Sequence, residues 1–137
     1  MMFLIRSKPL IAIVDDDESV CRALKRLVRS LGMNAETFTS GQKFLDLIEA
    51  MPSFHADCVV LDVQMPGLNG IEVQEQLMRS GDKFPIIFIT AHDDVGMRER
   101  ALSAGAVAFL RKPFDDELFI GTIREALKRG GKNGRKE

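Results

Sequence analysis

Five short apolar runs divide this chain, and they alternate with longer segments of helical periodicity. Four runs are unbroken, at residues 10–14, 58–61, 86–89 and 107–110, and a weaker, more polar run covers residues 35–38. Unbroken runs are typical of strands buried on both faces, whereas the polar run suits the edge of a sheet. Strand–helix alternation repeated in this way predicts an α/β fold, with helices on both faces of a doubly wound parallel sheet.

The segments between these runs carry apolar residues at the spacing of one helix face. They cover residues 20–31, 44–48, 71–78, 94–103 and 118–127, and Gln74 lies within the third. Helix ends are indicated by Ser40 as a cap before the second, by Gly32 after the first, and by Asp115 or Asp116 at the start of the fifth. Gly96, inside the fourth, costs about 1 kcal/mol relative to alanine, which favours a soft helix that moves during function.

The composition suits one globular domain, with 137 residues, of which 45% are hydrophobic and 28% charged. The formal net charge of -1 gives no general field for attracting nucleic acid or an anionic membrane. Cys21 and Cys58 lie in apolar patterns without further metal ligands nearby, which predicts free thiols in a reducing compartment. No apolar run approaches the roughly 20 residues that span a bilayer, and no signal peptide is indicated, so a cytoplasmic protein is expected.

Polar side chains follow the apolar runs at the carboxyl ends of the predicted strands. Three aspartates, residues 15–17, follow the first run, Asp62 follows the third, Thr90 follows the fourth and Lys112 comes soon after the fifth. Because sites in open parallel sheets form beyond the carboxyl ends of the strands, these groups are expected to converge on one rim. Crowded carboxylates repel unless a cation intervenes, and Mg²⁺ suits carboxylates, waters and phosphate oxygens. The rim therefore predicts a magnesium-dependent phosphoryl-transfer site.

Within this rim, Asp62 is the predicted nucleophile because it is central in the sheet and flanked by the other groups. A carboxylate that attacks a phosphoryl group forms an aspartyl phosphate, and such transfer depends mainly on positioning and charge neutralisation. Among the consecutive aspartates, Asp15 and Asp16 are preferred as metal ligands because they lie closest to the strand end. Asp17 or Ser19 is then left to cap the following helix.

Four segments resemble those of the receiver domains of bacterial two-component response regulators, in order and in spacing: IVDDDES, VVLDVQMPGLNG, IIFITA and FLRKPF. The likeness extends from Pro9 to Leu127, which is nearly the whole chain. It implies a CheY-like, flavodoxin-like (βα)5 fold with strand order 2-1-3-4-5. The domain is expected over residues 9–129, between an N-terminal arm (residues 1–8) and a flexible tail or linker (residues 130–137).

The resemblance also implies residue roles at the metal site. Asp62 corresponds to the phosphorylated aspartate, Asp16 to the direct Mg²⁺ ligand, and Asp15 to an acid that acts nearby through water. The backbone carbonyl of Gln64 is implied as a third protein ligand. Mg²⁺ is the expected cofactor, with Mn²⁺ as a substitute.

At the phosphoryl group and beyond it, the family pattern implies further positions. Thr90 and Lys112 would contact the phosphoryl group, and Thr90 and Phe109 would form a switch that responds to it. The Lys112–Pro113 peptide bond corresponds to a cis peptide of the family. The implied phosphodonor is a sensor histidine kinase.

Phosphorylation is expected to promote homodimerisation through the face formed by the fourth helix, the fifth strand and the fifth helix. Six charged residues are candidates for complementary contacts there: Arg98, Arg100, Arg111, Asp115, Asp116 and Glu117. Similar receivers often precede a LuxR-type helix-turn-helix domain, which favours part of a transcriptional regulator; a stand-alone receiver acting through protein partners is the alternative. The domain itself is expected to contact neither nucleic acid nor membrane.

Two other classes share parts of this pattern. A Mg²⁺-dependent phosphohydrolase with an aspartate nucleophile needs a second acid to activate water, but Gln64 stands two residues after Asp62. A flavin-binding module needs a phosphate loop rich in Ser, Thr and Gly after the first strand, where three aspartates would instead repel phosphate. We therefore expect a signalling domain that catalyses its own phosphorylation and dephosphorylation, rather than an enzyme acting on other substrates.

Overall fold

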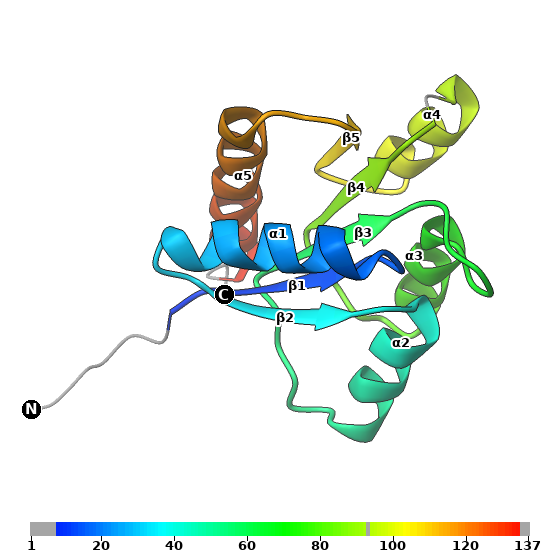
Figure 1. Cartoon of the computed structure of the whole chain (residues 1–137). Helices are drawn as coiled ribbons and strands as arrows, with labels where there is room; N and C mark the ends of the chain where they lie inside the picture. Colours follow the sequence, from blue (N-terminus) through cyan, green and yellow to red (C-terminus); the bar gives the residue numbers. More distant parts are fainter. Residues whose placement is uncertain (1–7, 93, 135–137) are drawn as a thin grey trace, which may run out of the picture.

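The computed structural model of the protein describes residues 8–92 and 94–134. In this part of the chain, five parallel strands form a central sheet (Figure 1). They are β1 (Leu10–Val14), β2 (Asn34–Phe38), β3 (Cys58–Asp62), β4 (Ile86–Thr90) and β5 (Ala108–Arg111), in the order β2-β1-β3-β4-β5. Every residue of β3 and β4 is buried, whereas β2 at the edge has exposed residues. The predicted doubly wound sheet, its strand order and its polar edge strand are confirmed.

Helices cover both faces of this sheet, and the described residues form five of them: α1 (Glu18–Ser30), α2 (Gly41–Ala50), α3 (Gly70–Arg79), α4 (Val95–Ser103) and α5 (Asp116–Gly134). Alternate strand residues point to opposite faces, so Val14 joins one apolar cluster and Ile13 the other. The first cluster packs against α2, α3 and α4, and the second against α1 and α5 (Figure 1). Cys21 and Cys58 are buried in the second cluster as free thiols, as predicted.

Short polar side chains begin the helices. The N-caps of the first four helices each accept a hydrogen bond from a backbone N–H of the first turn, and they are Asp17, Ser40, Asn69 and Asp94. Asp115 does the same for α5, because its Oδ1 accepts from the amide of Leu118. After α1, Gly32 adopts a φ of 83°, a left-handed conformation that glycine reaches without strain, and the chain turns into β2. The boundaries that depend on Ser40, Gly32 and Asp115 therefore lie where the sequence indicates.

α5 extends further than the sequence indicates. It continues to Gly134, so residues 130–134 of the expected tail are helical. A Cβ at Gly130 would lie 3.1 Å from Pro85 Cγ, so the missing side chain lets the helix pack closely beside the start of β4. Residues 1–7 of the expected arm and residues 135–137 of the expected tail lie outside the described residues. Neither α5 nor any other described helix combines the length and the apolar composition needed to cross a membrane.

Candidate functional site

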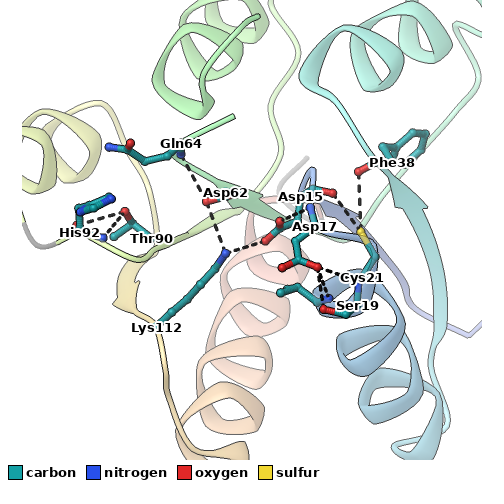
Figure 2. A network of polar contacts seen from close by, with 11 residues as sticks. Asp15, Asp17, Ser19, Cys21, Phe38, Asp62, Gln64, Thr90, His92 and Lys112 are labelled. Carbon is teal, nitrogen blue, oxygen red and sulfur yellow. Dashed lines mark hydrogen bonds and ion pairs between the residues drawn. The ribbon is translucent and has the colours of Figure 1, made fainter. Parts of the chain in front are cut away.

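The carboxyl ends of β1, β3 and β5 bring Asp15, Asp62 and Lys112 together (Figure 2). Asp15 directly follows β1 and is fully buried, and Asp62, the last residue of β3, is 3% exposed. Lys112 Nζ lies 2.9 Å from Asp15 Oδ2 and 3.7 Å from Asp62 Oδ1. Two buried carboxylates therefore face one ammonium group, although the three residues are far apart in the sequence.

A third carboxylate joins this rim. Asp15, Asp16 and Asp62 each place one carboxylate oxygen within 4.8 Å of the others. Asp17 has a different role, because its Oδ1 accepts hydrogen bonds from the amide and the hydroxyl of Ser19 at 2.9 and 2.6 Å. The cap of α1 thus uses the third of the consecutive aspartates and leaves the first two beside Asp62.

Backbone groups hold the two buried carboxylates in place. The amide of Asp17 donates to Asp15 Oδ1 at 2.9 Å, and the amide of Gln64 donates to Asp62 Oδ1 at 3.3 Å. The start of α3 lies directly against β3, since a Cβ at Gly70 would clash with the carbonyl oxygen of Asp62. Asp62 is therefore fixed both by its side chain and by its backbone.

The charges at the rim leave Asp62 incompletely neutralised. Burial and, next, the charge of Asp15 raise the pKa of Asp62 from 3.8 to about 7, although Lys112 and the amide of Gln64 oppose this rise. Desolvation lowers the pKa of Lys112, but its hydrogen bond with Asp15 and the nearby carboxylate charges outweigh this effect, so its pKa is raised. An additional positive charge would therefore stabilise the ionised rim.

Thr90 ends β4 and is fully buried, but its hydroxyl is engaged by the following loop. Its Oγ1 donates to the carbonyl oxygen of His92 and accepts from the amide of His92, both at 3.1 Å (Figure 2). Within the described residues, this hydroxyl makes no hydrogen bond with Asp62 or Lys112. A strand-end hydroxyl such as Thr90 is expected from the sequence to cap the loop that follows, but the sequence did not identify the His92 backbone as its partner.

Phe109 of β5 connects this region to α4. This residue is 5% exposed, and its ring centroid lies 6.0 Å from that of Phe88. The guanidinium of Arg98 lies 5.2 Å from the Phe109 ring centroid, a cation–π contact. Arg98, expected among the charges of a dimer face, therefore also contacts the expected switch position of its own chain. The Lys112–Pro113 peptide bond, just after β5, is cis.

Comparison with known families accounts for this arrangement. The profile of the response regulator receiver domain matches residues 11–124. The chain belongs to this family. Receiver domains are signalling domains of two-component response regulators rather than conventional enzymes, they bind Mg²⁺ at an acidic pocket, and they interact with histidine kinases.

Similar proteins support the same assignment. The response regulator protein TodT of Pseudomonas putida is 45% identical over 119 residues, which cover 87% of this receiver and 51% of TodT. The transcriptional regulatory protein FixJ of Bradyrhizobium diazoefficiens is 38% identical over 122 residues, covering 89% of this chain and 58% of FixJ. The receiver thus spans about half the length of these curated relatives.

Solved structures agree with the observed fold. The crystal structure of a response regulator receiver protein from Burkholderia phymatum has 60% sequence identity and a TM-score of 0.79, and the match covers 88% of this chain and 96% of that one. The structure of the response regulator StyR has 43% identity and a TM-score of 0.84, covering 94% of this chain and 64% of that one.

Proposed function

We propose that Asp62 accepts a phosphoryl group from the phosphohistidine of a sensor histidine kinase, in a Mg²⁺-dependent reaction. The observation that carries this proposal is the buried Asp62 carboxylate, which has an oxygen within 4.8 Å of carboxylate oxygens of Asp15 and Asp16 and lies 3.7 Å from Lys112 Nζ. A carboxylate is a competent phosphoryl acceptor when its neighbours position it and neutralise the charge that spreads over the phosphoryl oxygens.

The acidic rim has the chemistry of a Mg²⁺ site. Three carboxylate oxygens lie within 4.8 Å of one another, and the pKa of Asp62 is raised by burial and, next, by the charge of Asp15. Asp15, Asp16, Asp62 and the backbone carbonyl of Gln64 would hold the ion, with Mn²⁺ as a substitute. When bound, the ion would supply positive charge to the carboxylates and to the phosphoryl oxygens.

The residues of the chain then perform distinct tasks. A carboxylate oxygen of Asp62 attacks phosphorus, the new O–P bond forms, and the N–P bond to the kinase histidine breaks. Lys112, which pairs with Asp15, would contact one phosphoryl oxygen. The Thr90 hydroxyl would exchange its contacts with His92 for a second oxygen, and Phe109 would follow as the switch. Attack by water on phosphorus later releases inorganic phosphate and restores the Asp62 carboxylate.

A direct test uses acetyl phosphate as the donor. Incubation of the protein with acetyl phosphate and Mg²⁺ is expected to add one phosphoryl group, as measured by intact mass, and peptide mapping is expected to locate it on Asp62. Adding EDTA should abolish the modification, because the carboxylates would again repel the incoming anion. No adduct under any of these conditions, or an adduct elsewhere, would exclude Asp62 as the acceptor.

Phosphorylation is expected to promote homodimerisation through α4, β5 and α5. Val95 and Leu102 of α4 and Leu118 of α5 are exposed apolar residues on these helices. Three of the six candidate charges also have contacts within the chain, since Arg98 lies over the Phe109 ring, Arg100 pairs with Glu75 at 3.3 Å and Asp115 caps α5. Arg111, Asp116 and Glu117 remain exposed.

Light scattering, with and without beryllofluoride and Mg²⁺, measures this dimerisation. We expect the mass to rise toward that of a dimer only when the phosphoryl mimic is present. Leu118→Glu should prevent the rise, because a carboxylate would have to be desolvated in the interface, whereas Met51→Glu on the distant end of α2 should not. A monomer in both states at high protein concentration would contradict dimer-based output.

The curated relatives are longer than the region that matches this chain. FixJ, described as a transcriptional regulatory protein, extends well beyond the matched region. We propose the same kind of output here, with the receiver controlling transcription in the cytoplasm through a further domain; a stand-alone receiver that acts on protein partners is the alternative. The reading frame beyond Glu137 distinguishes the two.

A further inference from the structure

The contacts of α4 with the rest of the domain are concentrated in its middle and C-terminal part. Ala101 is the buried residue of this helix, and Met97 packs against the neighbouring apolar cluster. Arg98 lies over the Phe109 ring, and Arg100 Nη2 lies 3.3 Å from Glu75 Oε2 of α3. Each of these residues belongs to the segment 97–101.

The first turn of α4 is attached differently. Val95 is 65% exposed, and a Cβ at Gly96 would meet only the side chain of Asp94. The contacts of Asp94 are local, because its Oδ1 accepts from the amide of Met97 at 3.1 Å and its carbonyl accepts from the amide of Arg98. No hydrogen bond or ion pair joins residues 94–96 to another helix or strand within the described part of the chain.

Gln74 of α3 is a buried polar residue that contacts α4. It is 3% exposed, and the other buried polar or charged residues of the described chain, Asp15, Asp62 and Thr90, all lie at the phosphorylation rim. Its Nε2 donates to the carbonyl oxygen of Ala101 at 3.3 Å. A buried amide that loses its partner keeps its desolvation cost, so this contact specifies where α3 and α4 meet.

The Gln74 contact lies at the last turns of α4. The carbonyl of Ala101 also accepts from the amide of Ala106 at 3.0 Å, where the chain leaves the helix. At the other end, Thr90 is bound to the backbone of His92, which lies only two residues before Asp94. The contact of Thr90 is therefore nearer along the chain to the first turn of α4 than to the part that contacts Gln74.

We infer that Gln74 is a positioning residue that fixes the C-terminal part of α4 on α3, so that α4 yields at Gly96–Met97 and its first turn moves separately. The link to signalling rests on the proposed phosphorylation of Asp62. Under this inference, α4 responds to phosphorylation by opening or bending its first turn, and not by shifting as a rigid rod.

Residue-resolved hydrogen exchange of the protein without ligand tests the role of Gln74 directly. The amide of Arg98 reports on the first turn because its acceptor is the Asp94 carbonyl, and the amides of Ala104 and Ala106 report on the fastened end. We expect Arg98 to exchange at least about tenfold faster than Ala104 and Ala106. Gln74→Leu should accelerate Ala104 and Ala106 by at least about tenfold and change Arg98 by less than about twofold.

Controls separate this effect from general destabilisation. The amide of Val59, bonded to the Pro85 carbonyl within the sheet, reports on global unfolding, and the α4 effects must exceed any change there. Gln76→Leu, on the same helix, is the control and should leave the exchange rates of α4 unchanged. Gln74→Met replaces Gln74→Leu if the leucine variant does not fold. Equal exchange along α4 in the wild type, or an unchanged Ala104 and Ala106 in both Gln74 variants, would overturn the inference.

A second arm adds beryllofluoride and Mg²⁺ as a phosphoryl mimic. In the wild type the mimic should change the exchange rate of the Arg98 amide and should change the rates of the Ala104 and Ala106 amides by less than about twofold. In Gln74→Leu all three rates should change. Equal changes at all three amides in the wild type would indicate a rigid shift and contradict the inference. If the mimic changes no exchange rate, including that of the Gln64 amide beside Asp62, the proposed function fails. The experiment without ligand still decides the role of Gln74 in that case.

Discussion

Replacing Asp62 with asparagine is expected to stabilise the metal-free protein by about 2–4 kcal/mol at about pH 8, while removing the phosphoryl acceptor. Folding raises the pKa of Asp62 from 3.8 to about 7, chiefly through burial and the charge of Asp15. Between these values the folded state binds more protons than the unfolded state. The stability contributed by the protonated acid is therefore complete below about pH 4 and is lost as the pH rises through about 7. Asparagine does not titrate, so the variant avoids this loss.

Urea unfolding in EDTA at about pH 5 and about pH 8 measures the effect, and the advantage of Asp62→Asn should grow by about 2 kcal/mol between them. Mg²⁺ should then stabilise the wild type more than the variant. Asp46→Asn, an exposed substitution on α2, is the matched control and should show no such growth. If the difference in unfolding free energy between Asp62→Asn and the wild type were the same at both pH values, folding would not raise the pKa of Asp62.

Lys112→Met is expected to have the opposite effect on stability and to impair phosphorylation as well. Lys112 is the partner of the fully buried Asp15 at 2.9 Å, and it also lies 3.7 Å from Asp62. Removing one member of a buried ion pair leaves the other uncompensated, so we expect a loss of about 2–4 kcal/mol at neutral pH. Modification by acetyl phosphate should slow by at least about tenfold, because a charge that faces the phosphoryl oxygens is gone.

Two further variants serve as comparisons for Lys112→Met. Lys112→Arg retains the positive charge and should recover most of the stability, although the planar guanidinium need not restore the rate. Lys43→Met removes an exposed lysine that contacts Thr39, and it should change stability by less than about 0.5 kcal/mol. If Lys112→Met cost no more than Lys43→Met and reacted at the normal rate, Lys112 would have no role at the rim.

The fold was largely predictable because strands that are buried on both faces are continuous apolar runs in the sequence. The inner strands, such as β3 and β4, are unbroken apolar runs, and polar β2 stands at the edge. The end of α5 was not predictable in the same way. A glycine-rich, polar segment favours a flexible tail, but Gly130 meets Pro85, a residue distant in the sequence, and the helix continues.

The candidate site shows a similar division. Which residues stand at strand ends follows from the order of the chain, so the meeting of Asp15, Asp62 and Lys112 could be predicted from a parallel sheet. Gln74 stands three residues after Ile71 and three before Leu77, the spacing of one helix face, so its position on the inner face of α3 was also predictable. Its partner was not, because a hydrogen bond to the Ala101 carbonyl depends on how α3 and α4 pack, which no local pattern encodes.

The central sheet separates two apolar clusters, and only the one beneath α2, α3 and α4 adjoins the helix that we expect to move. Substitutions buried beneath α1 or α5 share few neighbours with those beneath α4, and the free-energy changes of such distant sites usually add. Robustness and responsiveness can therefore evolve, or be engineered, through different residues of one small domain. Substitutions on the α1 and α5 side of the sheet would then change mainly the stability of the domain, and substitutions on the α4 side would change mainly its response to phosphorylation.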